Sequence, residues 1–360
     1  MPSKTPINKI SEKSLKEYRG QVLKWYDKYQ RILPWRYVSG QTPDPYRVWI
    51  SEVMLQQTTV TAVKPYFEKF LSLWPTVEDL AATPREDVMS AWAGLGYYSR
   101  ARNLHSCAQI IANDYNGIFP QSQKELKSLP GIGDYTSAAL MTIAFNQPAT
   151  VVDGNVERVM ARLFAITDPL PKSKPLLKSI AAQWFNDFKT RPGDLAQALM
   201  DLGATICTPK SPKCNICPLE GVCKAKKINL ERELPKKTRK KPKPQKIGHV
   251  YWIKNNKNQI LLHKRPDKGL LGGMIALPTS DWLNQKQERN LSDPKAFKVK
   301  NTQKSINHSF THFDLQLILK EGSVRDDPLL EKEYMWCNVS DLDQIGFPSV
   351  FQKALKLFQT

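Results

Sequence analysis

The 360-residue sequence lacks any run of about 18 apolar residues, the length that a membrane-spanning helix requires. Its first residues, MPSKTPINKISEKSLKEY, also lack the apolar core of a secretory signal. No repeat of fixed period is visible, which argues against a solenoid. We therefore expect a soluble, cytoplasmic protein that does not associate with membranes.

Acidic residues are scarce relative to basic ones. The chain has 53 Lys and Arg against 34 Asp and Glu, so its formal net charge is +19. A charge this large favours a polyanionic partner, most simply nucleic acid. A solvated basic surface would give the same composition, so charge alone leaves both interpretations open.

Cysteine is scarce outside one loop. Four of the six cysteines follow the pattern Cys207-x6-Cys214-x2-Cys217-x5-Cys223. This crowding argues against a disulfide framework. Four thiolates without a nearby histidine suit either a [4Fe–4S] cluster or a structural zinc. Zinc ribbons usually contain two close cysteine pairs and this loop contains one, which favours the cluster.

Helical periodicity dominates from Lys16 to about Phe188, with short loops marked by proline and glycine. A helix is expected from Tyr46 onward, with Pro65 beginning a new segment. These residues predict a mainly α-helical N-terminal domain over residues 1–230, which includes the cysteine loop 207–223.

The chain changes character after the cysteine loop. Residues 231–247 are basic and contain prolines, which predicts an interdomain linker. Beyond it a period of two predicts a hairpin turning at 255–258, strands at 312–322 and 334–339, and a helix from Ser349. A smaller α+β domain over residues 248–360 fits this pattern.

The segment from Leu129 to Leu163 joins a glycine turn to a helix that follows an aspartate. Gly131 and Gly133, in LPGIG, allow a tight turn whose amides suit a phosphate. Asp153 precedes GNVERVMARL, whose apolar residues have helical spacing. An aspartate before a helix is ordinarily an N-cap, so position alone gives Asp153 no catalytic role.

Glu52 lies on the same predicted helical face as Val48, Trp49 and Leu55. Burial there would raise the pKa of its carboxyl group and could keep it protonated as a general acid. From position alone, a structural glutamate at the edge of a buried stripe is the simpler interpretation.

Together these features resemble one known family. The LPGIG turn, the VVDGNVERV segment and the four-cysteine loop are similar to helix-hairpin-helix DNA glycosylases that carry an iron–sulfur cluster. Members resembling endonuclease III use a lysine that forms a Schiff base, where this chain has Tyr135. A tyrosine cannot form an imine, which favours a monofunctional glycosylase over a lyase.

Further segments resemble the adenine-removing branch of that family. They are LPWR, SEVMLQQT and GLGYYSRARNLH in the N-terminal half, and GLLGGMIALP and HSFTHFDL in the C-terminal half. The C-terminal pair resembles a Nudix-like domain that reads 8-oxoguanine. No glutamate-rich Nudix helix follows Gly272 and Gly273, so we expect recognition without hydrolysis. Phe310-Thr311-His312 stands where many members have Phe-Ser-His, and threonine keeps the hydroxyl group.

The resemblance implies a base-excision-repair enzyme that flips out adenine mispaired with 8-oxoguanine or guanine in duplex DNA and leaves an abasic site. Glu52 would protonate adenine N7, and an ionised Asp153 would stabilise the sugar cation or trap it covalently. Tyr135 and Asn155 would hold the geometry of this pair. The implied DNA contacts are Trp35, Arg36, Gln57, Thr58, Leu95, Tyr97, Gly131, Gly133, Phe310, Thr311 and His312. The four cysteines would bind the [4Fe–4S] cluster, and the enzyme would act as a monomer, associated with the nucleoid through DNA.

Three alternatives stay open at this point. The nearest is an endonuclease III-like glycosylase and AP lyase acting on oxidised pyrimidines. A second is a non-catalytic, cluster-containing module that binds DNA or senses redox state. Nucleotide hydrolysis by the Nudix-like domain is the third, and the missing glutamates argue against it.

Overall fold

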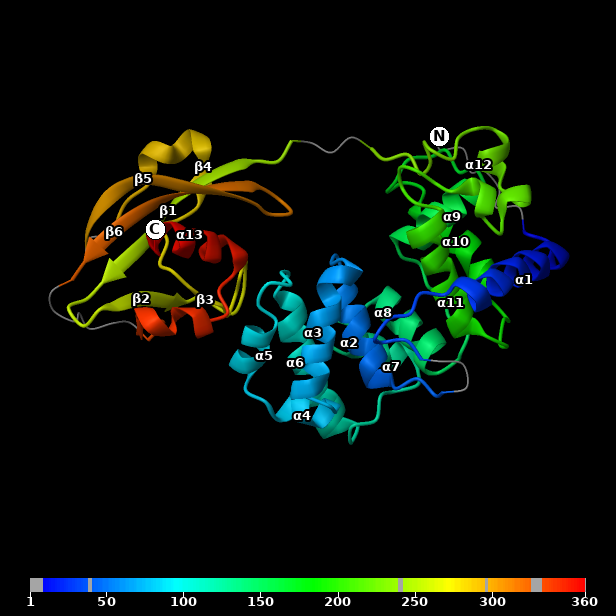
Figure 1. Ribbon diagram of the computed structural model, residues 1–360, viewed down its shortest axis with the longest axis horizontal. Coiled ribbons are helices and arrows are strands. Elements are labelled where there is room, and N and C mark those ends of the chain that lie inside the picture. The colour runs from blue at the N-terminus through cyan, green and yellow to red at the C-terminus, as the bar shows by residue number, and fades with distance from the viewer. Residues whose placement is uncertain (1–8, 38–40, 239–241, 295–296, 325–331, 360) are drawn as a thin grey trace. The chain divides into compact units, whose positions relative to one another are not determined.

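A computed structural model describes residues 9–37, 41–238, 242–294, 297–324 and 332–359 (Figure 1). The protein divides into two compact units, one comprising Met1–Ala81 and Ser106–Arg239, the other Ala82–His105 and Lys240–Thr360. Within the described ranges, no helix has both the length and the apolar character needed to cross a membrane.

Helices account for the ordered structure of the N-terminal two thirds of the chain. In chain order they are α1 (Glu12–Tyr29), α2 (Pro45–Leu55), α3 (Val60–Leu73), α4 (Val77–Ala82), α5 (Arg85–Ala91), α6 (Ser99–Asp114), α7 (Gln123–Ser128), α8 (Asp134–Ala139), η1 (Leu140–Ala144), α9 (Gly154–Leu163), α10 (Lys174–Phe185), α11 (Pro192–Asp201), η2 (Leu202–Ile206), η3 (Cys214–Ile216), η4 (Glu220–Val222) and α12 (Lys224–Lys227). The predicted helical character of this region is confirmed.

The single helix expected from Tyr46 to Pro65 is divided into two helices, α2 and α3. α2 ends at Leu55, and the side chain of Thr59 then caps α3 by accepting a hydrogen bond from the Ala62 amide. α3 continues through Pro65, so the prediction that Pro65 begins a new segment is wrong. A proline in the second turn of a helix removes one intrahelical hydrogen bond, and the packing of α3 tolerates that loss.

α9 lies at the centre of the first unit's core. Its residues Val156, Val159, Met160 and Leu163 are buried, as their spacing predicts. They belong to one apolar cluster with residues of α1, α10 and α11. Full burial of such side chains contributes about 1.5–3 kcal/mol each. The start of α9, where Asp153 lies, is therefore fixed by the core.

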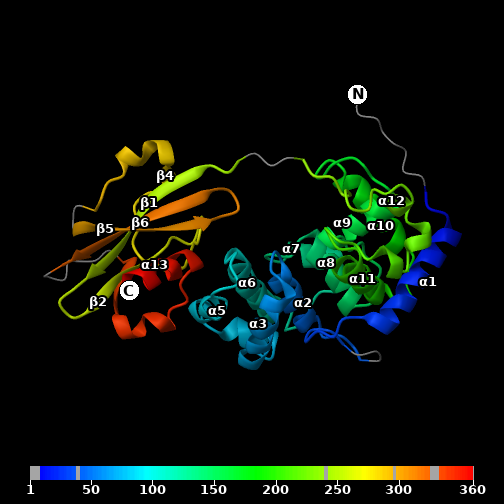
Figure 2. The same ribbon diagram turned by 45° about the horizontal axis from the view of Figure 1, so that its top comes forward.

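A seven-stranded mixed sheet forms the C-terminal region. Its strands are β1 (Gln245–Lys254), β2 (Gln259–Lys264), β3 (Ile275–Ala276), β4 (Leu283–Asn284), β5 (Lys298–Ser309), β6 (Asp314–Ser323) and β7 (Tyr334–Asn338). The main order is β3-β2-β1-β6-β5, with β1 and β6 parallel; β4 pairs with β1, and β7 with β2. Helix α13 (Ser349–Gln359) packs against the sheet through Val350, Phe351 and Ala354 (Figures 1 and 2). The predicted hairpin, strands and final helix are confirmed, whereas the polar strand β5 had no sequence signal.

Residues expected to form the linker contribute to ordered structure at both ends. The Leu170 amide donates to the Lys236 carbonyl at 2.8 Å, and the Thr238 amide donates to the Leu170 carbonyl at 3.1 Å. β1 begins at Gln245. The connection between the ordered elements is consequently shorter than the predicted span 231–247.

Candidate active site

A cavity of about 850 Å³ opens within the first unit, bordered by residues of α2, α3, α8, α9 and α11 and by the loops before α2 and after Ile143. Glu52, Tyr135, Asp153 and Asn155 all line it, although up to 103 residues of sequence separate them. The four residues predicted to perform catalysis are therefore brought together by the fold.

Glu52 enters the cavity from the buried face of α2, with only 6% of its surface exposed. The pKa of its carboxyl group is raised to about 7. Burial is the largest cause and the charge of Asp153 adds to it, whereas the Tyr135 hydrogen bond and the charge of Arg36 oppose it. A carboxyl group with a pKa in this range can hold a proton near neutral pH, as a general acid must. The predicted burial and raised pKa are confirmed.

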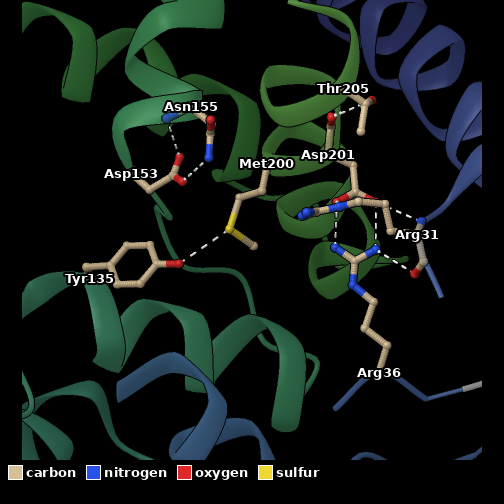
Figure 3. Close-up of polar contacts among 8 residues, drawn as sticks. All are labelled: Arg31, Arg36, Tyr135, Asp153, Asn155, Met200, Asp201 and Thr205. Carbon is tan, nitrogen blue, oxygen red and sulfur yellow. Dashed lines mark hydrogen bonds and ion pairs between the residues drawn. The ribbon is translucent and has the colours of Figure 1, made fainter. Parts of the chain in front are cut away.

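Tyr135 connects Glu52 to helix α11. Its hydroxyl donates to Glu52 Oε2 at 2.7 Å. The same hydroxyl lies 3.3 Å from Met200 Sδ (Figure 3). Burial raises the pKa of this phenol well above 10.0, so it stays neutral and acts as a donor. The Oε2 atom of Glu52 is therefore held by this bond.

Asp153 is the N-cap of α9 and also lines the cavity. Its Oδ1 accepts from the Asn155 amide at 2.9 Å and its Oδ2 from Asn155 Nδ2 at 2.7 Å (Figure 3). Oδ1 also accepts from the Val156 amide at 2.8 Å. Burial raises the pKa of Asp153, and these three donors oppose that effect by favouring the ionised form. The predicted N-cap is confirmed.

A hydrogen-bonded chain connects Asp153 to the cysteine loop. Asn155 Oδ1 accepts from Arg158 Nη2 at 2.8 Å, and Arg158 also donates to the carbonyls of Gly203 and Cys207 at 2.6 and 2.7 Å. A Cβ atom at Gly203 would lie 2.5 Å from Asn155 Cβ, so glycine is required for this close approach. Sequence reasoning missed Arg158 because nothing in its position reveals partners some 45 residues away.

Arg36, for which the resemblance implied DNA contact, is committed to another partner. It forms a two-pronged ion pair with Asp201 at 2.6 and 2.7 Å, and Arg31 joins at 2.6 Å (Figure 3). Burial alone would raise the pKa of Asp201, but the hydrogen bond and charge of Arg36 leave it below the usual value. Trp35 is buried with its ring 5.4 Å from Phe67. Both predicted residues line the cavity, but their observed contacts are internal to the protein.

Gln57 and Thr58 lie in the break between α2 and α3 and also line the cavity. Gln57 is exposed and has a φ of 58°, a strained conformation for a residue other than glycine. Its neighbour Gln56 donates to Thr136 Oγ1 at 3.3 Å, a contact that sequence reasoning missed. Gln57 is therefore presented to solvent by a backbone held in an unusual conformation.

The glycine turn forms as predicted between α7 and α8. Gly131 has a φ of 77°, which a side chain would disfavour, and Gly133 is the N-cap of α8. The neighbouring Asp134 pairs with Lys127 at 2.5 Å and Lys178 at 2.9 Å. These hydrogen bonds lower the pKa of Asp134 to about 2. Gly131 and Gly133 are exposed, whereas Ile132 between them is buried, and two lysines border the turn.

The four cysteines border one shared cavity. Among the residues that the structure describes, no three His, Cys, Asp or Glu side chains converge as ligands of a single metal ion. Four thiols around one cavity are a donor set that fits the [4Fe–4S] group expected from the sequence.

The second unit contains the remaining predicted residues. Tyr97 is 45% exposed with a φ of 48°, and its hydroxyl lies 3.3 Å from Thr311 Oγ1. Thr311 and His312 are exposed, and the Phe310 amide donates to the Phe313 carbonyl to close their turn. Leu95 is only 6% exposed, so its observed role is packing and its placement does not support the implied DNA contact.

The turn from Ser309 to Asp314 is held by the start of β1. Lys243 Nζ donates to Ser309 Oγ at 2.9 Å and to the Phe310 carbonyl at 2.6 Å. Gln245 Nε2 donates to Asp314 Oδ2 at 3.0 Å. Sequence reasoning placed Lys243 in the linker and missed this role.

Comparisons with known proteins agree with these observations. Residues 50–186 match the profile of the HhH-GPD superfamily of base excision DNA repair proteins, and residues 249–357 match that of the NUDIX domain. An adenine DNA glycosylase of Buchnera aphidicola subsp. Baizongia pistaciae (strain Bp) is 33% identical over 344 residues, which cover 93% of this chain and 94% of the relative.

The chain belongs to the adenine DNA glycosylase (MutY) family. The adenine DNA glycosylase of Homo sapiens is 36% identical over 322 residues, which cover 75% of this chain and 58% of the human protein. The structure of a thermostable thymine-DNA glycosylase aligns with a TM-score of 0.53 at 31% identity, covering 60% of this chain and 98% of that one. This adenine DNA glycosylase thus joins a helical HhH-GPD domain to a Nudix-like domain, and its activity is base excision in DNA repair.

Proposed function

We propose that this enzyme excises adenine paired with 8-oxoguanine in duplex DNA through general acid catalysis by Glu52 and charge stabilisation by Asp153. The observation that carries the proposal is the contrast between the two carboxyl groups. Burial raises the pKa of both carboxyl groups, to about 7 for Glu52, but Asp153 accepts three hydrogen bonds that favour its ionised form, whereas Glu52 has one described bond, from Tyr135. Two carboxyl groups in different protonation states are what glycoside cleavage requires.

Adenine must first leave the base stack, at a cost of a few kcal/mol that a mispair reduces. Within the cavity, Glu52 Oε1 transfers its proton to adenine N7 while the N-glycosidic bond breaks. The bonding electron pair leaves with the protonated base, and positive charge develops on the sugar. Tyr135 fixes the orientation of the acid through Oε2.

Asp153 acts on the sugar rather than on the base. Its ionised carboxylate stabilises the sugar cation, and Asn155 holds that carboxylate through Oδ2. Water then adds to the sugar carbon that carried the base and loses a proton to the Glu52 carboxylate. The product is an abasic site. Since Tyr135 supplies no amine, no Schiff base forms at this position and the strand is not cut.

The opposite base is read in the second unit. Thr311 carries an exposed hydroxyl beside the exposed ring of Tyr97. A hydroxyl group can donate to and accept from an oxidised guanine edge, and an aromatic ring can stack on a base. Residues 274–290 contain β3, β4 and η5 (Gln285–Asn290) and no α-helix, which supports recognition without nucleotide hydrolysis.

The cysteine loop would hold a [4Fe–4S] cluster through Cys207, Cys214, Cys217 and Cys223, which border one cavity. Lysines 210, 213, 224, 226 and 227 surround these ligands in sequence. The loop would thus serve as a rigid, basic contact for DNA phosphates.

The test uses a duplex that contains a single adenine opposite 8-oxoguanine. Single-turnover incubation followed by alkali should break the strand at that adenine, whereas omission of alkali should leave the strand intact. A matched duplex with adenine opposite guanine measures the preference for the oxidised base. The proposal fails if adenine is not released, and borohydride trapping of a protein–DNA adduct would favour the lyase alternative.

A further inference from the structure

Arg162 is the largest charged side chain in the interior of the first unit. It projects from α9 and is 2% exposed. Its guanidinium donates to Cys207 Sγ at 3.3 Å and to the carbonyls of Thr208, Pro209 and Leu234 at 2.8, 3.0 and 2.8 Å. Its contacts thus join a cysteine sulfur, the cysteine loop and the end of the helical domain.

The hydrogen bonds of Arg162 are satisfied, but its charge is not balanced by a carboxylate. In the part of the chain that the structure describes, Arg162 forms no ion pair with any Asp or Glu, and the acceptors are three neutral carbonyls and one sulfur. A buried cation without an anionic partner is strongly unfavourable. An anion is therefore expected beside it.

Two acidic residues border the same cavity, but their positions do not meet this requirement. Glu231 lies 3.9 Å from Lys226, and Glu220 makes no described bond with the guanidinium. The ionisable group that the guanidinium does contact is Cys207, whose Sγ lies 3.3 Å from Nη1. A [4Fe–4S] core of charge 2+ held by four thiolates has a net charge of 2−, which supplies the missing anion.

We infer that Arg162 is the buried counterion of the cysteine-bound cluster and sets its reduction potential. This inference rests on the cluster proposed above. A fixed positive charge beside the sulfur favours the more negative, reduced state. Loss of that charge lowers the potential, so the 3+ state forms more readily and iron is lost to oxidants.

A purely geometric role for Arg162 makes a different prediction. The planar guanidinium reaches three carbonyls at once, and lysine cannot reproduce that fork. If Arg162 served only to fasten the loop, Arg162→Lys and Arg162→Gln would be equally harmful. If charge is decisive, Arg162→Lys keeps the potential and Arg162→Gln does not.

The experiment compares wild type, R162K, R162Q and K210Q as full-length proteins purified under anaerobic conditions. Lys210 is exposed on the same loop, so K210Q removes an equal charge at a solvated position. The measurements are iron per chain, the visible absorption band, circular dichroism, the midpoint potential by protein-film voltammetry and the rate of iron release with ferricyanide.

We expect a lower potential and about tenfold faster iron release for R162Q, because a buried charge is screened far less than the exposed one removed in K210Q. R162K and K210Q should keep the wild-type potential. Equal shifts in R162K and R162Q, or no shift in either, would overturn the inference. If R162Q does not fold, the midpoint potential of R162K tests the inference alone. A wild-type potential in R162K supports a role of charge, and a shifted potential contradicts it. Wild-type protein without iron would instead overturn the proposed cluster.

Discussion

The hydroxyl of Tyr135 donates a 2.7 Å hydrogen bond to Oε2 of Glu52. By the resemblance, lyases of this family have their Schiff-base lysine at this position, so we expect Tyr135 to exclude imine formation and, in the proposed mechanism, to orient Glu52. This bond opposes the effect of burial on the pKa of Glu52, and the net result is a pKa raised to about 7. In the proposed mechanism the other oxygen, Oε1, carries the proton that is transferred.

Tyr135→Phe should slow adenine excision by about tenfold, because the acid loses the bond that orients it. The pKa of Glu52 should rise, so the midpoint of activity loss with increasing pH should move upward. Single-turnover rates from pH 5 to 9 measure both effects. Met200→Leu removes only the sulfur contact of Tyr135 and serves as the control. An unchanged pH profile in Y135F would contradict the assigned bond.

The raised pKa of Glu52 also predicts how stability depends on pH. Its ordinary pKa is 4.5 and its folded value is about 7, so the folded state binds the proton more tightly. The contribution is fully present below pH 4.5 and is lost as pH rises through 7. Glutamine does not titrate, so the free energy of unfolding of Glu52→Gln should gain on that of wild type as pH rises. The difference between the two proteins should shift in favour of the variant by up to about 3 kcal/mol between pH 4 and pH 8. Urea unfolding at the two pH values tests this, and an equal effect of the substitution at both would argue against a raised pKa.

Asp153→Asn should retain folding and duplex binding but lose excision. The amide oxygen can still accept the backbone N–H bonds that cap α9, whereas the negative charge is gone. Asp153→Ala is the matched comparison, since it should also destabilise the protein by about 1 kcal/mol through loss of the cap. Binding and single-turnover excision are measured on the same duplex. Excision by D153N within about tenfold of wild type, or about 1.4 kcal/mol of barrier, would remove Asp153 from the mechanism.

The Arg36 and Asp201 pair should be essential for stability. The Asp201 side chain is fully buried, so its removal leaves Arg36 without its counterion. Asp201→Ala should lower the free energy of unfolding by about 3–5 kcal/mol. The exposed pair of Lys172 and Asp168 is the control, for which Lys172→Ala should cost less than about 1 kcal/mol. Similar costs for both variants would mean that the Arg36 pair contributes no more than a surface pair.

Lys243→Met should weaken discrimination for the oxidised base without slowing the chemistry. Lys243 holds the turn that presents Thr311, so its loss should free that turn. We expect the ratio of excision rates for adenine opposite 8-oxoguanine and opposite guanine to fall by about fivefold, the equivalent of one lost hydrogen bond. Lys300→Met, an exposed lysine on β5, should leave the ratio unchanged. An unaltered ratio in K243M would show that the turn is held by other contacts.

The sequence by itself determined much of the local structure. The helical spacing after Asp153 predicted α9, and the period-two pattern around residues 255–258 predicted the β1–β2 hairpin. The glycine spacing predicted the turn between α7 and α8. Such features depend on residues a few positions apart, which is why they can be recognised without the fold.

Tertiary structure decided the electrostatics of the site. Position on a helix made the burial of Glu52 plausible, but its hydrogen bond to Tyr135 joins residues 83 positions apart. The diversion of Arg36 to Asp201 spans 165 positions, and the contact of Arg162 with Cys207 spans 45. Strand β5 went unpredicted because its exposed residues are polar and its pairing partner, β6, supplies the order. Burial and charge pairing are properties of side chains brought together by packing, so only the folded chain fixes which carboxyl group holds a proton and which arginine is available.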